Sequence, residues 1–206
     1  NSSGGGGGAF VYTTGPNTLL VAAGGGGGKC NYIGSGPLHP GADGSITNNG
    51  NPSSDGAGLG GVSGNGGDAG LWSGIPCSGG GAGWLTVGGG PYGGLNYATW
   101  AGGIGFCGGG GGGCGGVGGF GGGGGGGNHY GGGGGGGGYS GGGGGTDPTH
   151  GGGGGSFSIG MNQANVAGFQ TGDGQVIFTW SGNGCTNVTR TPITVTVNPD
   201  PTVTAS

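Results

Sequence analysis

The side chains best suited to chemistry in this chain are five cysteines, Cys30, Cys77, Cys107, Cys114 and Cys185. None belongs to a Cys-x-x-Cys pair and no histidine lies at metal-ligand spacing from them, so the pattern does not favour zinc. Because only 4% of the residues are charged, the composition favours disulfides formed in an oxidising compartment over a zinc site. Cys107 and Cys114 flank six glycines and would staple the ends of that run if it turns back. Cys30 with Cys77 would then close a large loop and leave Cys185 unpaired, although five cysteines allow other connectivities.

Other catalytic groups are scattered along the chain. His39, His129 and His150 lie in loop-like sequence and are more typical of surface polar residues than of metal ligands. Ser140 and Ser156 border glycine runs without the strand–turn–helix context of a nucleophile elbow. Gly-x-Gly-x-x-Gly occurs repeatedly, but no copy opens a helix, as a dinucleotide site requires. We therefore expect a protein that is not an enzyme and has no organic cofactor.

Three aspartates are candidate calcium ligands together with backbone carbonyls, namely Asp43, Asp55 and Asp68. Their spacing matches no EF-hand loop, in which the ligands lie within twelve residues. Aspartate also caps turns through its side-chain oxygens. We expect the turn-capping role and keep calcium as the alternative.

Aromatic residues are the remaining candidates for binding. Trp72, Tyr92, Tyr97 and Trp100 could bind a surface glycan or a protein partner if rigid loops present them. The same residues, with Trp84, could instead plug the ends of a glycine bundle, where side chains are tolerated. The sequence favours this second role, in which the aromatic side chains plug the ends of the bundle.

The elements that must position these groups are dominated by glycine, which occupies 78 of the 206 positions. Seven runs have five or more glycines, and they are 4–8, 24–28, 108–113, 121–127, 131–138, 141–145 and 151–155. Glycine has no Cβ to bury and loses more backbone freedom on ordering than any other residue. Order must therefore come from backbone hydrogen bonds. Polyproline II geometry, with three residues per turn, points those groups outward to neighbours in every direction.

We expect the runs to form a polyglycine II bundle. Its core would include Gly121, Gly124, Gly131, Gly134 and Gly138. A flexible linker is the alternative, but flexible linkers mix serine with glycine, and disordered segments carry high net charge. Here serine is nearly absent from the runs and aromatic residues bound them.

The charge balance excludes several classes of function. The formal net charge is −4, and Lys29 and Arg190 are the two basic residues. Without a basic patch, nucleic-acid binding is not expected. No apolar stretch approaches 18 residues, so no membrane span is expected.

Strand-like segments frame the runs, whereas helical periodicity is missing. The predicted strands are 9–12, 18–22, 84–87, 156–159, 175–180 and 193–197. Residues 34–83 have the composition of a loop, or of short polyproline II passes joined by turns. We expect a mostly β and polyproline II fold with essentially no α-helix, in which an antiparallel β-sandwich carries the glycine runs as long crossovers.

The order of the motifs resembles a known domain over residues 4–180. The motifs include Gly-Gly-Ala-Phe, Leu-Leu-Val-Ala-Ala-Gly, Gly-Tyr-Ser-Gly and Gly-Asp-Gly-Gln-Val-Ile-Phe-Thr-Trp. They resemble the glycine-rich domain of the anaplastic lymphoma kinase and leukocyte tyrosine kinase receptors, in the version found in large bacterial surface proteins. That resemblance implies a tumour-necrosis-factor-like β-sandwich with inserted polyglycine II helices. Family members usually open with an extra strand or two before the first run, so a missing strand would leave an exposed sheet edge here.

The tail has a different character, and we expect residues 1–180 to form the glycine-rich domain and 181–206 a C-terminal strand or linker. The tail is similar to the closing strand of immunoglobulin-like repeats in adhesins of gliding bacteria and other exported Bacteroidetes proteins. Ile193, Val195 and Val197 alternate with threonine. An exposed edge accepts a strand from another chain, so this segment is a candidate assembly strand. Pairing within its own subunit, or the start of a next tandem domain, is the alternative.

These features predict a non-enzymatic structural or adhesive module, found outside the cell or on its surface. It would be a rigid scaffold of a bacterial adhesin or filament, and its partners would be other copies of itself, a surface glycan or a protein. A protein-ligand-binding module like the receptor domains is the second hypothesis. A glycine-rich ice-binding protein is the third, although the long runs lack a regular Gly-X-X array with flat faces.

Overall fold

The computed structural model of the chain describes residues 2–13, 15–30, 41–96, 102–103, 115–127, 131–172, 174–177 and 179. The chain divides into two compact units, Asn1–Val176 and Ile177–Ser206. Almost all described residues belong to the first unit, whose fold is given below. The predicted assembly strand with Ile193, Val195 and Val197 lies outside the described residues.

Five short strands and no helix occur in the described part of the chain. They are β1 (Ala9–Tyr12), β2 (Leu19–Ala23), β3 (Gly70–Trp72), β4 (Ile75–Ser78) and β5 (Phe157–Ser158). They form a three-stranded sheet in the order β1-β2-β5 and a separate β3-β4 hairpin, and every pair is antiparallel. The prediction of a mostly β chain without α-helix is confirmed for these residues.

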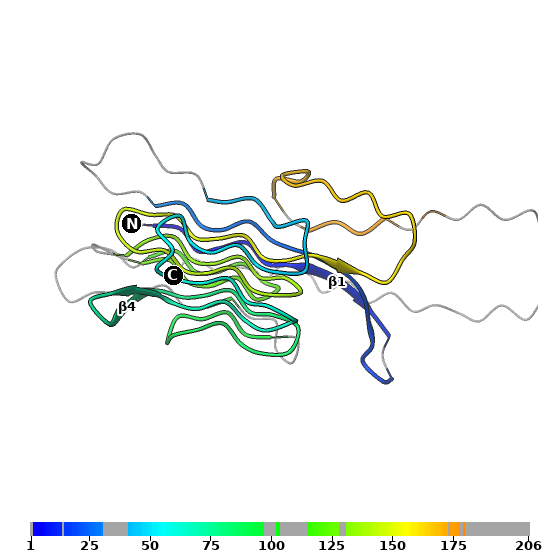
Figure 1. Cartoon of the computed structure of the whole chain (residues 1–206), viewed down its shortest axis with the longest axis horizontal. Coiled ribbons are helices and arrows are strands. Elements are labelled where there is room, and N and C mark those ends of the chain that lie inside the picture. Colours follow the sequence, from blue (N-terminus) through cyan, green and yellow to red (C-terminus); the bar gives the residue numbers. More distant parts are fainter. Residues whose placement is uncertain are drawn as a thin grey trace, which may run out of the picture. The chain divides into compact units, whose positions relative to one another are not determined.

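The three-stranded sheet continues directly from three glycine runs. Residues 4–8 lead into β1, β2 leads into residues 24–28, and residues 151–155 lead into β5. The strands begin where the glycines give way to apolar residues, because a pleated sheet is stabilised by side-chain packing that glycine lacks. Figure 1 shows these segments running side by side as long, nearly straight passes.

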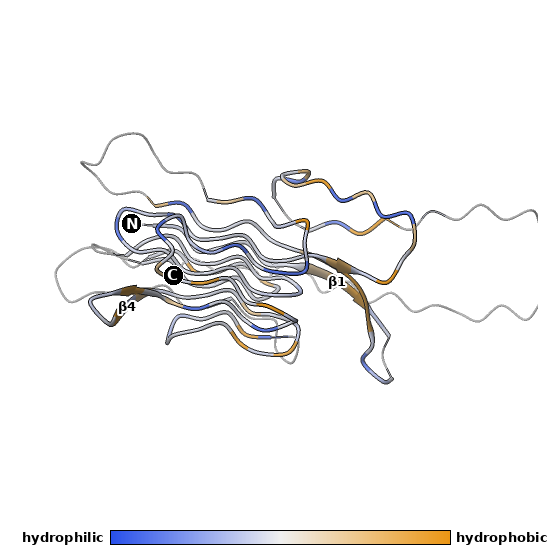
Figure 2. Cartoon of the chain, viewed as in Figure 1, coloured by the Kyte–Doolittle hydropathy of each residue, from blue (hydrophilic) through white to orange (hydrophobic). Residues whose placement is uncertain are grey.

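A small hydrophobic core sits under this sheet. Leu19, Ala22 and Trp84 are buried in it, and Phe10 and Phe157 pack against them. Figure 2 shows the glycine passes as pale ribbon, with hydrophobic residues at the strands and in several of the loops. Side-chain burial therefore accounts for only a small part of the folded unit.

Two of the predicted strands are wrong. Residues 84–87 form no strand, because the amide of Trp84 donates to the carbonyl of Tyr139 and that of Leu85 donates to the carbonyl of Gly64. These bonds lead to two different segments, so no sheet ladder forms. The predicted strand 175–180 is also not formed, since its described residues 175–177 and 179 are not in a strand. The described residues thus contain one sheet and one hairpin, without the two packed sheets of a sandwich.

Residues 34–83 are predicted to be a loop or short polyproline II passes, and for the described residues 41–69 the second interpretation is the better one. Ser45, Asn51 and Gly61 donate their backbone N–H groups to carbonyls of neighbouring glycine runs. The segment therefore adds further passes to the glycine-rich part of the fold. The β3-β4 hairpin that follows was not predicted.

Candidate functional site

The candidate functional site is the hydrogen-bonded glycine array, whose centre is the run 131–138. From residue 133 onward, each backbone N–H of this run donates to one of three neighbouring segments, and the choice repeats every third residue. In all three segments the acceptor number rises with the donor number, so these neighbours are parallel to the run. The pairs are Gly133 to Thr149, Gly136 to Gly152, Tyr139 to Gly155, Gly134 to Ser3, Gly137 to Gly6, Gly135 to Gly79 and Gly138 to Ala82, at 2.8–3.2 Å.

The carbonyl groups of the same run accept hydrogen bonds from three other segments, again with a period of three. Here the donor number falls as the acceptor number rises, so these neighbours are antiparallel. The donor and acceptor pairs are Gly145 to Gly133, Gly142 to Gly136, Gly28 to Gly134, Gly25 to Gly137, Gly127 to Gly132 and Gly124 to Gly135, at 2.7–2.9 Å. The run is therefore surrounded by three parallel and three antiparallel segments, and three residues per repeat is the periodicity of polyproline II geometry.

The close approach of these backbones explains why the positions are glycine. A Cβ atom built on any of the eight glycines of 131–138 would lie within 3.0 Å of a backbone atom in a neighbouring segment. The same holds for residues 141–145 and 151–155. The predicted core positions Gly121, Gly124, Gly131, Gly134 and Gly138 are all buried in this array.

Hydroxyl groups supply array partners where the passes turn or end, and sequence reasoning missed this role. Ser78 Oγ donates to the carbonyl of Gly145 at 2.6 Å, and Ser2 Oγ donates to that of Gly131 at 2.8 Å. Ser140 Oγ accepts from the amide of Gly64 at 3.0 Å. All three serines are buried. A lone serine at the border of a glycine run is the sequence signal that could have predicted this role.

One end of the array is closed by aromatic side chains. Trp84 is 8% exposed, and its ring centroid lies 6.0 Å from that of Phe10 and 5.4 Å from that of Tyr12. Tyr139 and Phe157 stack nearby with centroids 4.6 Å apart. Trp84 thus has the environment that the plug interpretation predicts.

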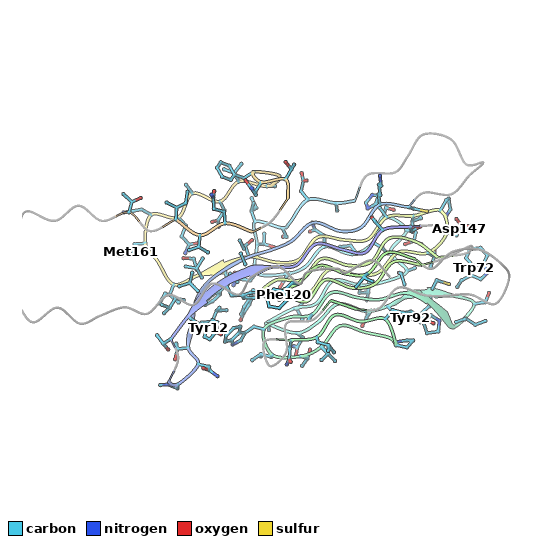
Figure 3. All side chains as sticks on the ribbon, turned by 180° about the vertical axis from the view of Figure 1, so that it is seen from behind. Tyr12, Trp72, Tyr92, Phe120, Asp147 and Met161 are labelled. Carbon is cyan, nitrogen blue, oxygen red and sulfur yellow. The ribbon has the colours of Figure 1, made fainter. Side chains whose placement is uncertain are left out.

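The β3-β4 hairpin presents aromatic and aliphatic side chains instead of burying them. Trp72 is 55% exposed and Ile75, its cross-strand partner, is 65% exposed. Ser73 and Gly74 form the turn with φ values of 49° and 81°, which suits a two-residue hairpin. Figure 3 shows Trp72, Tyr92 and Asp147 toward the same end of the molecule. Trp72 is therefore not a plug, and the candidates Tyr97 and Trp100 lie outside the described residues.

Asp55 caps a turn, as predicted for the aspartates of this region. Its carboxylate accepts from Ser53 Oγ at 2.6 Å, from the amide of Ala57 at 3.1 Å and from the hydroxyl of Thr146. Burial raises the pKa of Asp55, but these hydrogen bonds and one involving Thr149 outweigh burial, so the pKa is lowered overall. Within the described residues, no group of three or more His, Cys, Asp or Glu side chains could hold a metal ion.

The two described cysteines are buried, free thiols. The predicted disulfide between Cys30 and Cys77 is therefore not formed in the structure. Cys30 Sγ lies 3.4 Å from Ser2 Oγ, whereas Cys77 Sγ donates to the carbonyl of Ile75 at 3.4 Å. Burial raises the pKa of the Cys77 thiol, which keeps it in the unreactive protonated form. Cys107 and Cys114 lie outside the described residues.

No family model matches the chain, and neither a curated protein nor a solved structure matches it. Among the described residues, no helix has the length and apolar character needed to cross a membrane. The hydrogen-bond geometry of the array is therefore the main basis for a functional interpretation.

Proposed function

We propose that this chain is a non-enzymatic structural or adhesive module, in which a polyglycine II bundle acts as a rigid scaffold. The observation that carries the proposal is the run 131–138, hydrogen-bonded to three parallel and three antiparallel neighbours. Bending or shearing such an array requires many lateral hydrogen bonds to break together. Each bond contributes only about 0.5–1.5 kcal/mol net, but they are numerous and oriented around every side of the run.

The proposal places the module on an exported bacterial protein, at the cell surface or in a filament. The resemblance to receptor-type glycine-rich domains supports this location, as does the tail's similarity to adhesin repeats. A tumour-necrosis-factor-like sandwich around the bundle belongs to the same proposal. A charge-poor surface with exposed aliphatic and aromatic side chains is compatible with contacts to other copies or to a target surface.

The mechanical role is tested by pulling single molecules of the full chain between its termini. A scaffold should resist unfolding and give way in one cooperative step, because the segments of the array share their hydrogen bonds. A gradual extension without force peaks, typical of a flexible linker, would contradict the proposal. Resistance of residues 121–155 to proteases of broad specificity offers a second readout.

A protein- or glycan-binding role is a second candidate, favoured by the exposed hairpin. Trp72 and Ile75 lie on a tight turn at the end of a rigid array, and such presentation limits the entropy lost on binding. Trp72→Ala should abolish binding to a target surface, whereas Leu85→Ala, which also removes an exposed side chain, should not. Equal binding by both variants would exclude the hairpin as the contact.

Assembly through the C-terminal segment remains a prediction. Deletion of residues 191–206, followed by light scattering, should abolish head-to-tail assembly if these residues complete the sheet of a neighbouring copy. Unchanged assembly by the truncated chain would show that the segment has another role.

A further inference from the structure

Asparagine followed by glycine is the sequence in which a side-chain amide is most easily lost from a protein. The structure describes two such pairs, Asn49–Gly50 and Asn65–Gly66, and a third, Asn183–Gly184, lies outside the described residues. Asparagine counts among the thermolabile residues of proteins. The following glycine increases the lability, because it has no side chain that would hinder the attack of its own backbone nitrogen on the asparagine.

The reaction is a deamidation through a cyclic intermediate. The glycine N–H loses its proton, the nitrogen forms a bond to Cγ of the asparagine, and the Cγ–Nδ2 bond breaks as ammonia leaves. Water then opens the succinimide ring at either carbonyl, which gives aspartate or isoaspartate. Ring closure requires the peptide plane between the two residues to turn and any hydrogen bond donated by the glycine N–H to break.

Burial does not protect the side chains of the two described asparagines. Asn49 and Asn65 are both exposed, and the glycines that follow them are half-buried. Both amides are therefore open to water, and any protection has to come from the backbone that surrounds them.

The peptide plane between Asn65 and Gly66 is held at both ends. The carbonyl of Asn65 accepts from the amide of Gly141 at 2.9 Å, and the amide of Gly66 donates to Thr86 Oγ1 at 2.8 Å. The side-chain amide is held as well, since Asn65 Nδ2 donates to the carbonyl of Val62 at 3.0 Å. Turning this plane toward ring closure would break its hydrogen bonds to Gly141 and Thr86.

The plane between Asn49 and Gly50 is held by different partners. The carbonyl of Asn49 accepts from Thr47 Oγ1 at 3.3 Å, and the amide of Gly50 donates to the carbonyl of Gly61 at 3.0 Å. Gly50 is also packed into the array, because a Cβ atom on it would fall against the carbonyl oxygen of Gly141. The glycine N–H is thus bound by a backbone carbonyl in this pair, whereas a side-chain hydroxyl binds it in the other.

We propose that Asn65 is a deamidation site that the Thr86 hydroxyl keeps intact in the folded chain, while backbone contacts keep Asn49 intact. Thr86 acts here as a positioning residue, because it fixes the nitrogen that would attack. It is itself exposed, so its side chain can be changed without opening a cavity in the core. This inference goes beyond the proposed scaffold and rests on that proposed function only for its biological purpose, which is a long chemical lifetime.

The first test follows deamidation of the full chain at mildly alkaline pH, by peptide mapping with mass spectrometry. Asn49 and Asn65 should each react at least about tenfold more slowly in the folded chain than in guanidinium chloride, because ring closure requires local opening of the array. Equal rates in the folded and unfolded chains would overturn the inference. Slow amide exchange in residues 133–138 of the same sample would then leave the scaffold proposal standing.

The second test removes the hydroxyl alone. Thr86→Val should speed deamidation at Asn65 by about two- to tenfold, the range that corresponds to one lost hydrogen bond. Asn49 is the control within each sample and should react at its original rate. Thr86→Ser is the matched variant, since serine keeps a hydroxyl, and it should leave the rate at Asn65 unchanged.

Three results of the second test would overturn the role of the hydroxyl. The first is an unchanged rate at Asn65 in Thr86→Val. The second is an equal rise at Asn49 and Asn65, because Thr86 would then stabilise the fold as a whole. The third is a rise in Thr86→Ser as large as in Thr86→Val, because the threonine would then act through packing. Faster deamidation at Asn65 alone, in the valine variant alone, is the expected result.

Discussion

A Cβ atom on Gly134 would fall against the carbonyl oxygen of Gly124, well inside the 3.0 Å that real Cβ contacts respect. We therefore predict that Gly134→Val destabilises the fold by about 3 kcal/mol, since no flexible side chain can move aside and the added atoms overpack a dense array. Denaturant unfolding monitored by circular dichroism measures the loss.

Gly6→Ala provides the matched control for that substitution. It adds a methyl group to a glycine run where the nearest atoms lie at 3.4 Å. In dilute protein its stability should stay within about 1 kcal/mol of the original chain, or rise slightly because alanine restricts the unfolded state. Equal tolerance of both substitutions would favour a linker over an ordered array.

Amide hydrogen exchange should divide the chain into two classes. Within the runs 121–127 and 131–138, the buried glycines 124–127 and 133–138 should exchange slowly, because their backbone N–H groups donate hydrogen bonds to carbonyls of neighbouring segments. Residues 160–172 are exposed and should exchange quickly. Coil-like rates throughout both glycine runs would exclude the bundle.

The stability of the fold should depend on the protonation of Asp55. Its folded pKa lies below the unfolded value of 3.8, so the carboxylate stabilises the fold above that pH, and this contribution is lost as the pH falls through the folded pKa. Asp55→Asn should therefore unfold more easily at neutral pH and lose less stability on acidification. Thermal melts between neutral and strongly acidic pH measure the difference, and Asp68→Asn, at an exposed position, controls for the loss of one carboxylate.

Truncation of the buried Trp84 and of the exposed Trp72 should change the stability of the fold by different amounts. Trp84→Ala removes the buried plug of the array end and should cost about 3–5 kcal/mol. Trp72→Ala acts at an exposed hairpin position and should change stability by no more than about 0.5 kcal/mol. Similar losses for both variants would show that the hairpin is also part of the folded core.

Local sequence predicted several elements well because their signals are local. Residues 9–12 and 18–22 were predicted as strands, and β1 and β2 occupy Ala9–Tyr12 and Leu19–Ala23. The turn-capping role of Asp55 likewise depends on Ser53 and Ala57, its near neighbours in sequence.

Contacts between distant segments explain the failures. Trp84 begins a strand-like tetrapeptide, yet its amide is bonded to Tyr139, a residue that no local pattern connects to it. The exposed β3-β4 hairpin was not predicted, because its segment has the composition of a loop. A serine–glycine turn is also a weak signal for a hairpin among so many glycines. The prediction of a Cys30–Cys77 disulfide was wrong, because the pairing of cysteines depends on how the chain segments are arranged in space. Local sequence does not give that arrangement.

The sequence by itself determined that order in this chain must come from backbone hydrogen bonds, since 78 glycines offer no side chains to bury. It also predicted a fold without helices, as the described residues have, and it predicted strands at β1, β2 and β5, where apolar residues adjoin a glycine run. Only the tertiary structure decided which segments surround the run 131–138, in which direction each one runs, and that Gly6 and Gly26 are left facing solvent. The reason is physical, because one glycine run is chemically identical to another and its neighbours are selected by the turns and side chains that join the passes.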